Sequence, residues 1–318
     1  MAHPCHHLQA LMHTTDHIRA ALDTPMQLGE CPIWHRNEST LYWIDIPGKA
    51  IHSLTPSTGT HRSWPMPAEP GCIAFCNDAG GASAGKSGGN LLVALRTGLL
   101  TLDTSSGKLT EIADAPYDTA KLRFNDGRCD AAGRLWVGTL YEPRDRQGAT
   151  LYKFTHGVLR DQQQPATVSN GVAFSPDNRT MYRTDTTSHT IFAFDYDLAN
   201  GQLGAGRVLH TFSQDKTNNY GGRPDGAAVD VEGAYWCAMF EGGRILRLSP
   251  QGEILREIKI PARCPTMLAF GGPDMRTLYI TTGCNGRSEA ELAEYPLSGC
   301  VLTLEVDVAG LPEHAYIP

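Results

Sequence analysis

Oxygen-bearing side chains stand at matching positions of a recurring sequence unit. They are Glu30 in LGECPIW, Asn125 in RFNDGRCD, Asn170 in SNGVAF and Asp225 in PDGAAVD. Carboxylate and amide oxygens that converge on one place, with no His or Cys in phase, suit Ca²⁺, Mg²⁺ or Mn²⁺, with Zn²⁺ and Fe²⁺ as further candidates. A bound cation would also relieve the repulsion between Glu30 and Asp225. The residue types therefore predict a site for one divalent metal ion.

Each of these residues also has a simpler interpretation. Asn-Gly and Asp-Gly are common turn dipeptides, so Asn170 and Asp225 could serve only to close turns. Their common phase favours a ligand set. Arg123 stands two residues before Asn125, where its directional donors could hold a carbonyl or hydroxyl of a polar substrate; a surface salt bridge is the alternative.

The unit that would position these residues recurs six times. It consists of a short strand, a turn, an apolar strand with aromatic residues, a second turn and a strand of alternating pattern. The second strands are expected at 41–46, 90–95, 134–140, 180–185, 234–239 and 277–282. They are spaced by roughly 44 to 53 residues, which is typical of propeller blades. Each third strand follows in register.

The repeat predicts an all-β fold, a six-bladed β-propeller with a central metal site. The first strand of each blade lines the channel, so equivalent residues of different blades meet at one mouth. The first strands are expected to start at Glu30, Gly71, Asn125, Asn170, Asp225 and Thr266. An open all-β sandwich is the alternative fold. Residues 80–90 form a Gly-rich insertion in the second blade, predicted to be flexible.

Composition narrows the classes of partner. The 318 residues carry a formal net charge of −7 and no basic run, which argues against nucleic acid. No apolar run approaches the roughly 20 residues that span a bilayer. Nine scattered cysteines indicate neither a disulfide framework nor a zinc site. We expect a soluble, cytoplasmic protein, monomeric or a small homo-oligomer. The His-rich residues 1–15 form an extension without supporting strands and are left out of the site.

Several motifs resemble the gluconolactonase/regucalcin family of the senescence-marker-protein type. They include LGECPIW, LYWIDI, RFNDGRCDAAGRLWVGT, SNGVAFSPDNRTMYRTDT, RPDGAAVDVEGAYWCAM and FGGPDMRTLYITT. The resemblance runs from about residue 16 to the end and implies one propeller lactonase domain over 16–318.

The resemblance also implies roles for individual residues. It makes Glu30, Asn170 and Asp225 the metal ligands, and Arg123 and Asn125 substrate contacts. Glu142 lies where relatives place acidic residues on a loop over the pocket. A family Gly is replaced by Cys31, which could alter the backbone or bring a thiol near the metal.

The expected reaction is metal-dependent hydrolysis of a sugar-acid lactone, namely xylono-, arabinono-, galactono- or gluconolactone. A divalent ion (Ca, Zn, Mn, Mg or Fe(II)) would polarise the carbonyl for attack by water. Asp225 is the expected base, and a hydroxide on the metal is its alternative. Two other functions stay open: hydrolysis of phosphotriesters or aryl esters, and a non-catalytic calcium-binding propeller.

Overall fold

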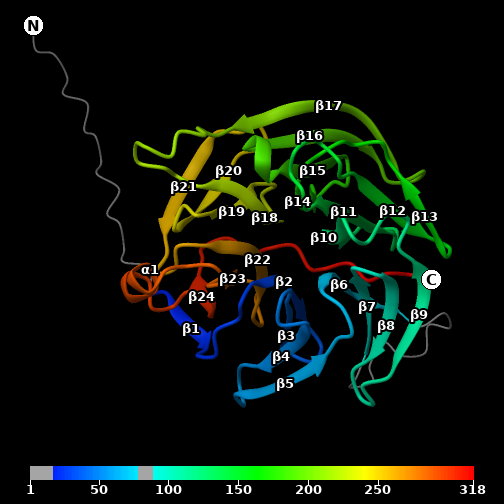
Figure 1. The fold of residues 1–318 in the computed structure, drawn as a ribbon, viewed down its shortest axis with the longest axis horizontal. Coiled ribbons are helices and arrows are strands. Elements are labelled where there is room, and N and C mark those ends of the chain that lie inside the picture. Colours follow the sequence, from blue (N-terminus) through cyan, green and yellow to red (C-terminus); the bar gives the residue numbers. More distant parts are fainter. Residues whose placement is uncertain (1–16, 78–88) are drawn as a thin grey trace, which may run out of the picture.

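Six four-stranded antiparallel sheets surround a central channel in the computed structural model, which describes residues 17–77 and 89–318 (Figure 1). The first three blades contain β2 (Gly29–His35), β3 (Thr40–Asp45), β4 (Ala50–Thr55) and β5 (Thr60–Pro65); β6 (Pro70–Cys76), β7 (Asn90–Leu95), β8 (Gly98–Asp103) and β9 (Leu109–Asp114); and β10 (Leu122–Cys129), β11 (Leu135–Tyr141), β12 (Leu151–Thr155) and β13 (Val158–Asp161).

The fourth and fifth blades follow the same order. They contain β14 (Ser169–Phe174), β15 (Thr180–Asp185), β16 (Thr190–Asp197) and β17 (Gln202–Thr211); and β18 (Arg223–Val229), β19 (Tyr235–Phe240), β20 (Arg244–Leu248) and β21 (Ile254–Lys259). The sixth contains β22 (Pro265–Gly271), β23 (Thr277–Thr282) and β24 (Val301–Glu305), with α1 (Glu289–Glu294) before β24. The predicted propeller and its second and third strands are confirmed.

The sixth blade takes its outer strand from the other end of the chain. β1 (Arg19–Leu22) pairs antiparallel with β24, which joins the N-terminal part of the domain to its last blade. This pairing gives the last blade its fourth strand and closes the ring. The sequence analysis did not foresee it, because four residues with no blade-like pattern are too short a signal.

Aromatic residues on the second strands form the layer between neighbouring blades. Trp136 and Trp236 occupy equivalent places on β11 and β19, where Tyr42 and Tyr182 stand on β3 and β15, and both tryptophans are almost fully buried. The indole N–H groups of Trp136 and Trp236 donate to Asp130 Oδ2 (2.9 Å) and Asp230 Oδ2 (2.8 Å). Each aspartate lies in the turn before its second strand, so one side chain fixes both turn and core.

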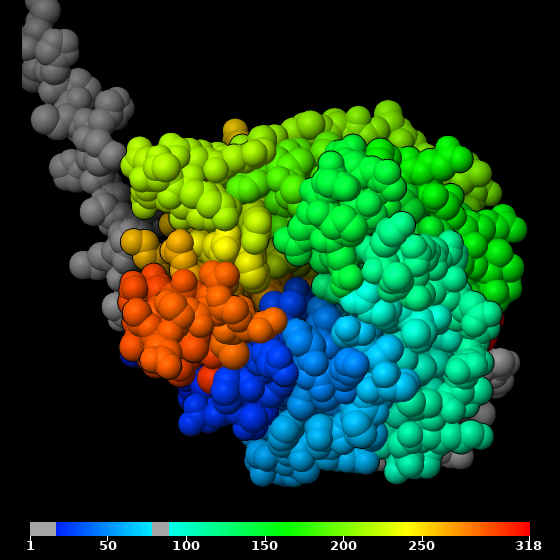
Figure 2. Space-filling model, viewed as in Figure 1, coloured from blue at the N-terminus to red at the C-terminus, as the bar shows by residue number. Residues whose placement is uncertain are grey.

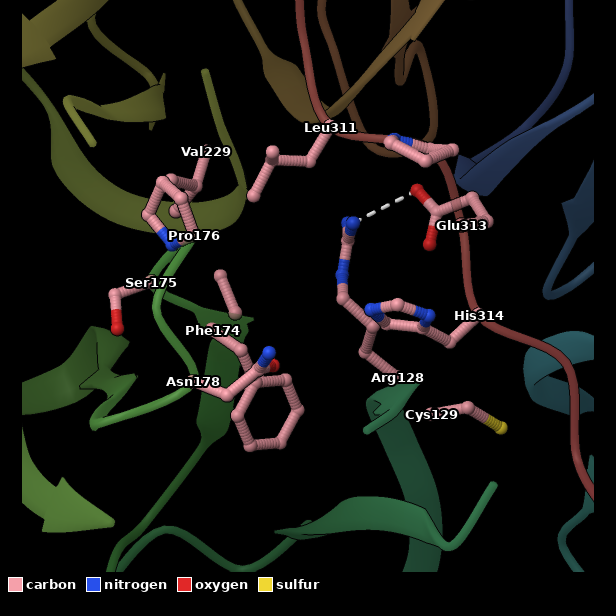
Figure 3. A pocket seen from close by; sticks show the side chains of 12 residues that line it. Arg128, Cys129, Phe174, Ser175, Pro176, Asn178, Val229, Leu311, Glu313 and His314 are labelled. Carbon is pink, nitrogen blue, oxygen red and sulfur yellow. Dashed lines mark hydrogen bonds and ion pairs between the residues drawn. The ribbon is translucent and has the colours of Figure 1, made fainter. Parts of the chain in front are cut away.

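The residues after the last blade cross one end of the channel (Figure 1). Gly310 forms a bridge with Asp230 of the fifth blade, and Tyr316 forms one with Cys76 of the second. Glu313 accepts a 2.7 Å bond from Arg128 of β10, whose guanidinium also donates to the carbonyls of Val172 and Ala227 (Figure 3). We call residues 309–318 the C-terminal strap. It leaves the opposite mouth, a depression at the centre of Figure 2, as the open end.

Some predictions concern residues outside the described ranges. Residues 1–15 lie there, and so does most of the 80–90 insertion, which falls between β6 and β7. The eight cysteines of the described residues are free thiols. No helix in the described ranges is both long and apolar enough to cross a membrane.

Candidate functional site

The start of each first strand carries a β-bulge at the open mouth. Register shifts occur between Glu30 and Ile33, between Asn170 and Ala173, and at the matching places of the other four blades. A bulge places two residues opposite one and turns a side chain away from the regular alternation. The residues that share a phase in the sequence therefore stand at the same bulge of each blade. The bulge turns one residue per blade toward the mouth.

Four of the six residues meet there, and three of them are joined by a chain of hydrogen bonds. Asn125 Nδ2 donates to Asn170 Oδ1 at 2.5 Å, and Asn170 Nδ2 donates to Asp225 Oδ1 and to Thr186 Oγ1, the latter at 2.8 Å. Glu30 lines the same pocket. Asn125, Asn170 and Asp225 are all buried, so the amides are held in fixed orientations.

The other two residues at this phase, Gly71 and Thr266, supply no oxygen atom to the pocket. A Cβ on Gly71 would lie 2.3 Å from the carbonyl oxygen of Phe124, so the approach of blades two and three admits only glycine. Thr266 turns its hydroxyl to Gly29 O (2.5 Å) and to Thr281. The donor set therefore comes from blades one, three, four and five.

The two carboxylates of the site are desolvated and are repelled by neighbouring carboxylates. Burial raises the pKa of Glu30 well above its ordinary value, and repulsion from Asp225 and Asp126 raises it further. Burial likewise raises the pKa of Asp225 to about 8, even though Arg223 opposes the shift. Two desolvated carboxylates, with the side-chain amide of Asn170 next to Asp225, offer the hard oxygen atoms that divalent cations prefer. The residues present thus fit a metal ion.

The three candidate metal ligands are not all His, Cys, Asp or Glu, because one of them is an asparagine. Among the described residues no three such side chains are grouped to hold a metal. Here Glu30 and Asp225 supply the carboxylates, and the amide of Asn170 would be the third ligand.

Arg123 lies beside the amide chain on β10. Its Nη1 donates to Asn125 Oδ1 at 2.7 Å and to Phe124 O at 3.0 Å. Burial lowers the pKa of Arg123, while attraction to Glu30 counters that effect. The side chain is only 8% exposed, so this arginine is a fixed cation on the pocket wall rather than half of a surface salt bridge.

Glu142 lies outside the residues that line the pocket. Its carboxylate is exposed and pairs with Arg96 Nη2 at 2.5 Å, while Arg96 also binds Glu69. The predicted loop acid is thus held at the rim of blades two and three. Arg144, two residues further, lines the pocket in its place.

Cys31 takes the backbone conformation that the family glycine implies. Its φ is +46°, in the left-handed region, as is that of Gly171 after Asn170 at +64°. The thiol turns away from Glu30: it donates to Ile73 O at 3.4 Å and accepts from Ile73 N at 3.3 Å. Burial raises the pKa of this thiol above its ordinary value, so Cys31 joins two blades and brings no thiolate to the site.

Arg223 and Asp126 are residues that the sequence analysis missed. Arg223 precedes Asp225 by two residues, as Arg123 precedes Asn125, so the same phase rule would have found it. Asp126 is buried beneath the mouth, where its Oδ2 accepts from Val172 N at 2.9 Å. Its position beside Asn125 was its only sequence signal.

Comparison with known proteins finds relatives that carry the names of lactonases. The model of the SMP-30/Gluconolactonase/LRE-like region matches residues 28–284. A 6-deoxy-6-sulfogluconolactonase of Pseudomonas putida is 43% identical over 301 residues, covering 94% of this chain and 98% of that protein. A pentonolactonase of Haloferax volcanii is 32% identical over 303 residues, covering 93% and 97%.

A solved structure agrees with the fold. The calcium-binding protein regucalcin of Agrobacterium tumefaciens superposes with a TM-score of 0.86 at 27% identity, covering 95% of this chain and 97% of that one. The family match spans most of the domain and includes every strand that carries the site. This chain therefore belongs to the SMP-30/gluconolactonase/LRE-like family.

Proposed function

We propose that this chain hydrolyses the ring ester of a sugar-acid lactone with the help of one divalent metal ion. The observation that carries the proposal is the meeting of Glu30, Asn170 and Asp225 beside the Arg123–Asn125 pair in one pocket. Support comes from relatives whose names are those of lactonases, including the sulfogluconolactonase and the pentonolactonase.

Glu30, Asn170 and Asp225 would hold the metal. When bound, a divalent cation supplies Lewis-acid polarisation of the carbonyl and compensates the negative charge that develops during water attack. The raised pKa values of Glu30 and Asp225 support this assignment, because a cation would stabilise both carboxylates in their ionised form.

Arg123 and Asn125 would orient the substrate. Arg123 uses Nη1 to hold Asn125, so its other guanidinium N–H groups can donate to the carbonyl oxygen or a ring hydroxyl. Asp225 would take the proton from the attacking water at a carboxylate oxygen and return it to the ring oxygen as the ester bond breaks. This cycle consumes one water and needs no nucleophilic Ser or Cys.

Hydrolysis of phosphotriesters or aryl esters is the competing reaction at such a site. Proton release in a pH-stat assay compares xylono-, arabinono-, galactono- and gluconolactone with a phosphotriester and an aryl ester, after correction for spontaneous hydrolysis. We expect the highest kcat/KM on an aldonolactone. Preference for the phosphotriester or aryl ester would replace the proposal with that activity, and no turnover of any compound would favour a binding protein.

A further inference from the structure

The open mouth carries more positive charge than lactone hydrolysis requires. Arg144 and Arg223 line the pocket in addition to Arg123. Arg123 is engaged with Asn125, whereas the roles proposed above leave the other two arginines without a task. A lactone ring has no carboxylate of its own, because that group is esterified.

Arg223 is held in place by an aromatic ring and a carboxylate. Its guanidinium packs over the ring of Phe240 at 5.1 Å, and its Nη2 lies 3.5 Å from Glu241 Oε2. Its Nε is buried and has no hydrogen-bond partner among the described residues. A planar guanidinium fixed on an aromatic ring is preorganised to present its terminal N–H groups to an anion.

Glu241 does not neutralise the charge around Arg223. Its carboxylate also pairs with Lys216 at 3.1 Å and with Arg287 at 3.5 Å. One carboxylate is thus shared by three cations, of which Arg287 also pairs with Glu291 at 3.6 Å, so Glu241 offsets only part of the charge of Arg223.

Arg144 approaches from the other side of the fourth blade. It follows β11 of the third blade, whereas Arg223 begins β18 of the fifth, and Thr186 and Thr187 of the fourth blade line the pocket as well. The side chain of Arg144 is exposed. Two arginines from flanking blades that line one pocket supply the charge-assisted donors that an oxyanion requires.

We propose that Arg144 and Arg223 bind an anionic group, a sulfonate or a phosphate ester, at the end of the sugar remote from the lactone carbonyl. The inference rests on the proposed function and deepens it, because it selects anionic sugar lactones over neutral ones. Arg guanidinium groups bind sulfonates and phosphate esters alike by charge-assisted hydrogen bonds. The proposal therefore names an oxyanion, and the substrates below distinguish its two forms.

The test compares substrates that differ only at this end. kcat/KM is measured on gluconolactone, 6-phosphogluconolactone and 6-deoxy-6-sulfogluconolactone with the wild-type chain, Arg144→Gln, Arg223→Gln and the double variant. We expect at least one anionic lactone to be preferred about tenfold or more, and the double variant to abolish that preference. The anionic lactone whose kcat/KM exceeds that of gluconolactone by the larger factor identifies the anion that the site prefers. Arg36→Gln, which removes an exposed arginine at the far end of the first blade, should keep the wild-type ratio.

A binding measurement separates this inference from the proposed function. Titration calorimetry compares gluconate, its 6-phosphate and its 6-sulfonate, which share the C1 carboxylate. Tighter binding of a 6-anionic acid, lost in the double variant, supports the anion site even if no lactone is hydrolysed. Equal affinity for all three acids, or an anionic preference that survives in the double variant, would overturn it whatever the lactonase activity.

Discussion

The proposed function gives Asp225 two roles whose demands conflict. As a ligand it should stay ionised, whereas as a base it must accept a proton, and a carboxylate bound tightly to a cation is a weak base. Its amide neighbour Asn170 fixes one oxygen, Oδ1, and leaves Oδ2 free for the second role. The assignment of Asp225 as the base is therefore the step of the mechanism that most needs a direct test.

The substitution Asp225→Asn separates the two roles. It keeps the size and one ligand oxygen but removes the charge and the basicity. If Asp225 is the base, kcat at saturating metal should fall about 10²-fold or more. The measurement is kcat against metal concentration, and recovery of the wild-type kcat with excess metal would show that the ion activates water without this carboxylate.

The residues of the site were largely predictable, and the exceptions have physical reasons. Glu30, Asn125, Asn170 and Asp225 share a phase, and a repeat converts phase into position. The orientation of Cys31 could not be predicted, because a left-handed φ turns the thiol toward Ile73. The ion pair of Glu142 with Arg96 joins separate blades, and no local pattern encodes such a contact.

At the level of elements, second and third strands were easier to predict than the segments that tie blades together. The strands inside blades follow clear apolar patterns, and DAAGR and DVEGA mark the turns before β11 and β19. β1 and the C-terminal strap depend on pairing between distant residues. Such pairing leaves little trace in the local sequence.

Two histidines on the first blade give its outer strands a pH dependence. His52 Nδ1 lies 3.1 Å from His61 Nε2, and both rings lie nearly parallel to that of Trp43. Burial lowers the pKa of His52 to about 4, and the charge of His61 lowers it too. Between the ordinary value of 6.5 and about 4, the folded chain binds fewer protons than the unfolded chain, so stability falls as the pH drops through this range.

We expect His52→Phe to remove part of this dependence while keeping an aromatic ring beside Trp43. Between pH 7.5 and 5 the wild-type chain should lose about 1 to 2 kcal/mol more than the variant, allowing for the partial exposure of the ring. Urea unfolding at the two pH values measures the difference. His17→Gln, at an exposed position, should behave as wild type, and equal losses in the wild-type chain and His52→Phe would disprove the assignment.

The C-terminal strap makes a separate prediction about stability. Tyr316 is buried, stacks on Phe154 at 5.2 Å, and its N–H donates to Phe75 O at 2.7 Å. Tyr316→Ala should lower the free energy of unfolding by about 2 to 4 kcal/mol, whereas Tyr316→Phe should retain most of it. Chemical denaturation measures both variants, and an unchanged midpoint for the alanine variant would mean that the strap adds no stability.

For the whole molecule, closure of the ring is what brings the proposed metal ligands together. Glu30 and Asp225 are 195 positions apart in the numbering (225 − 30), and they face one pocket only because β1 and the strap hold six blades around one axis. The propeller supplies no chemistry by itself. The open mouth, with its buried carboxylates and its arginines, is where this chain is adapted for a reaction.

The most direct test of the account is a metal titration of lactonase activity. Proton release from gluconolactone, corrected for spontaneous hydrolysis, is followed for the metal-stripped chain as Ca²⁺, Mn²⁺ or Zn²⁺ is added, and for Glu30→Gln treated in the same way. We predict no enzymatic rate without metal and full recovery at about one ion per chain. Glu30→Gln should require about 100-fold more metal. Full activity of the stripped wild-type chain, or identical titrations for the two proteins, would contradict the metal site proposed here.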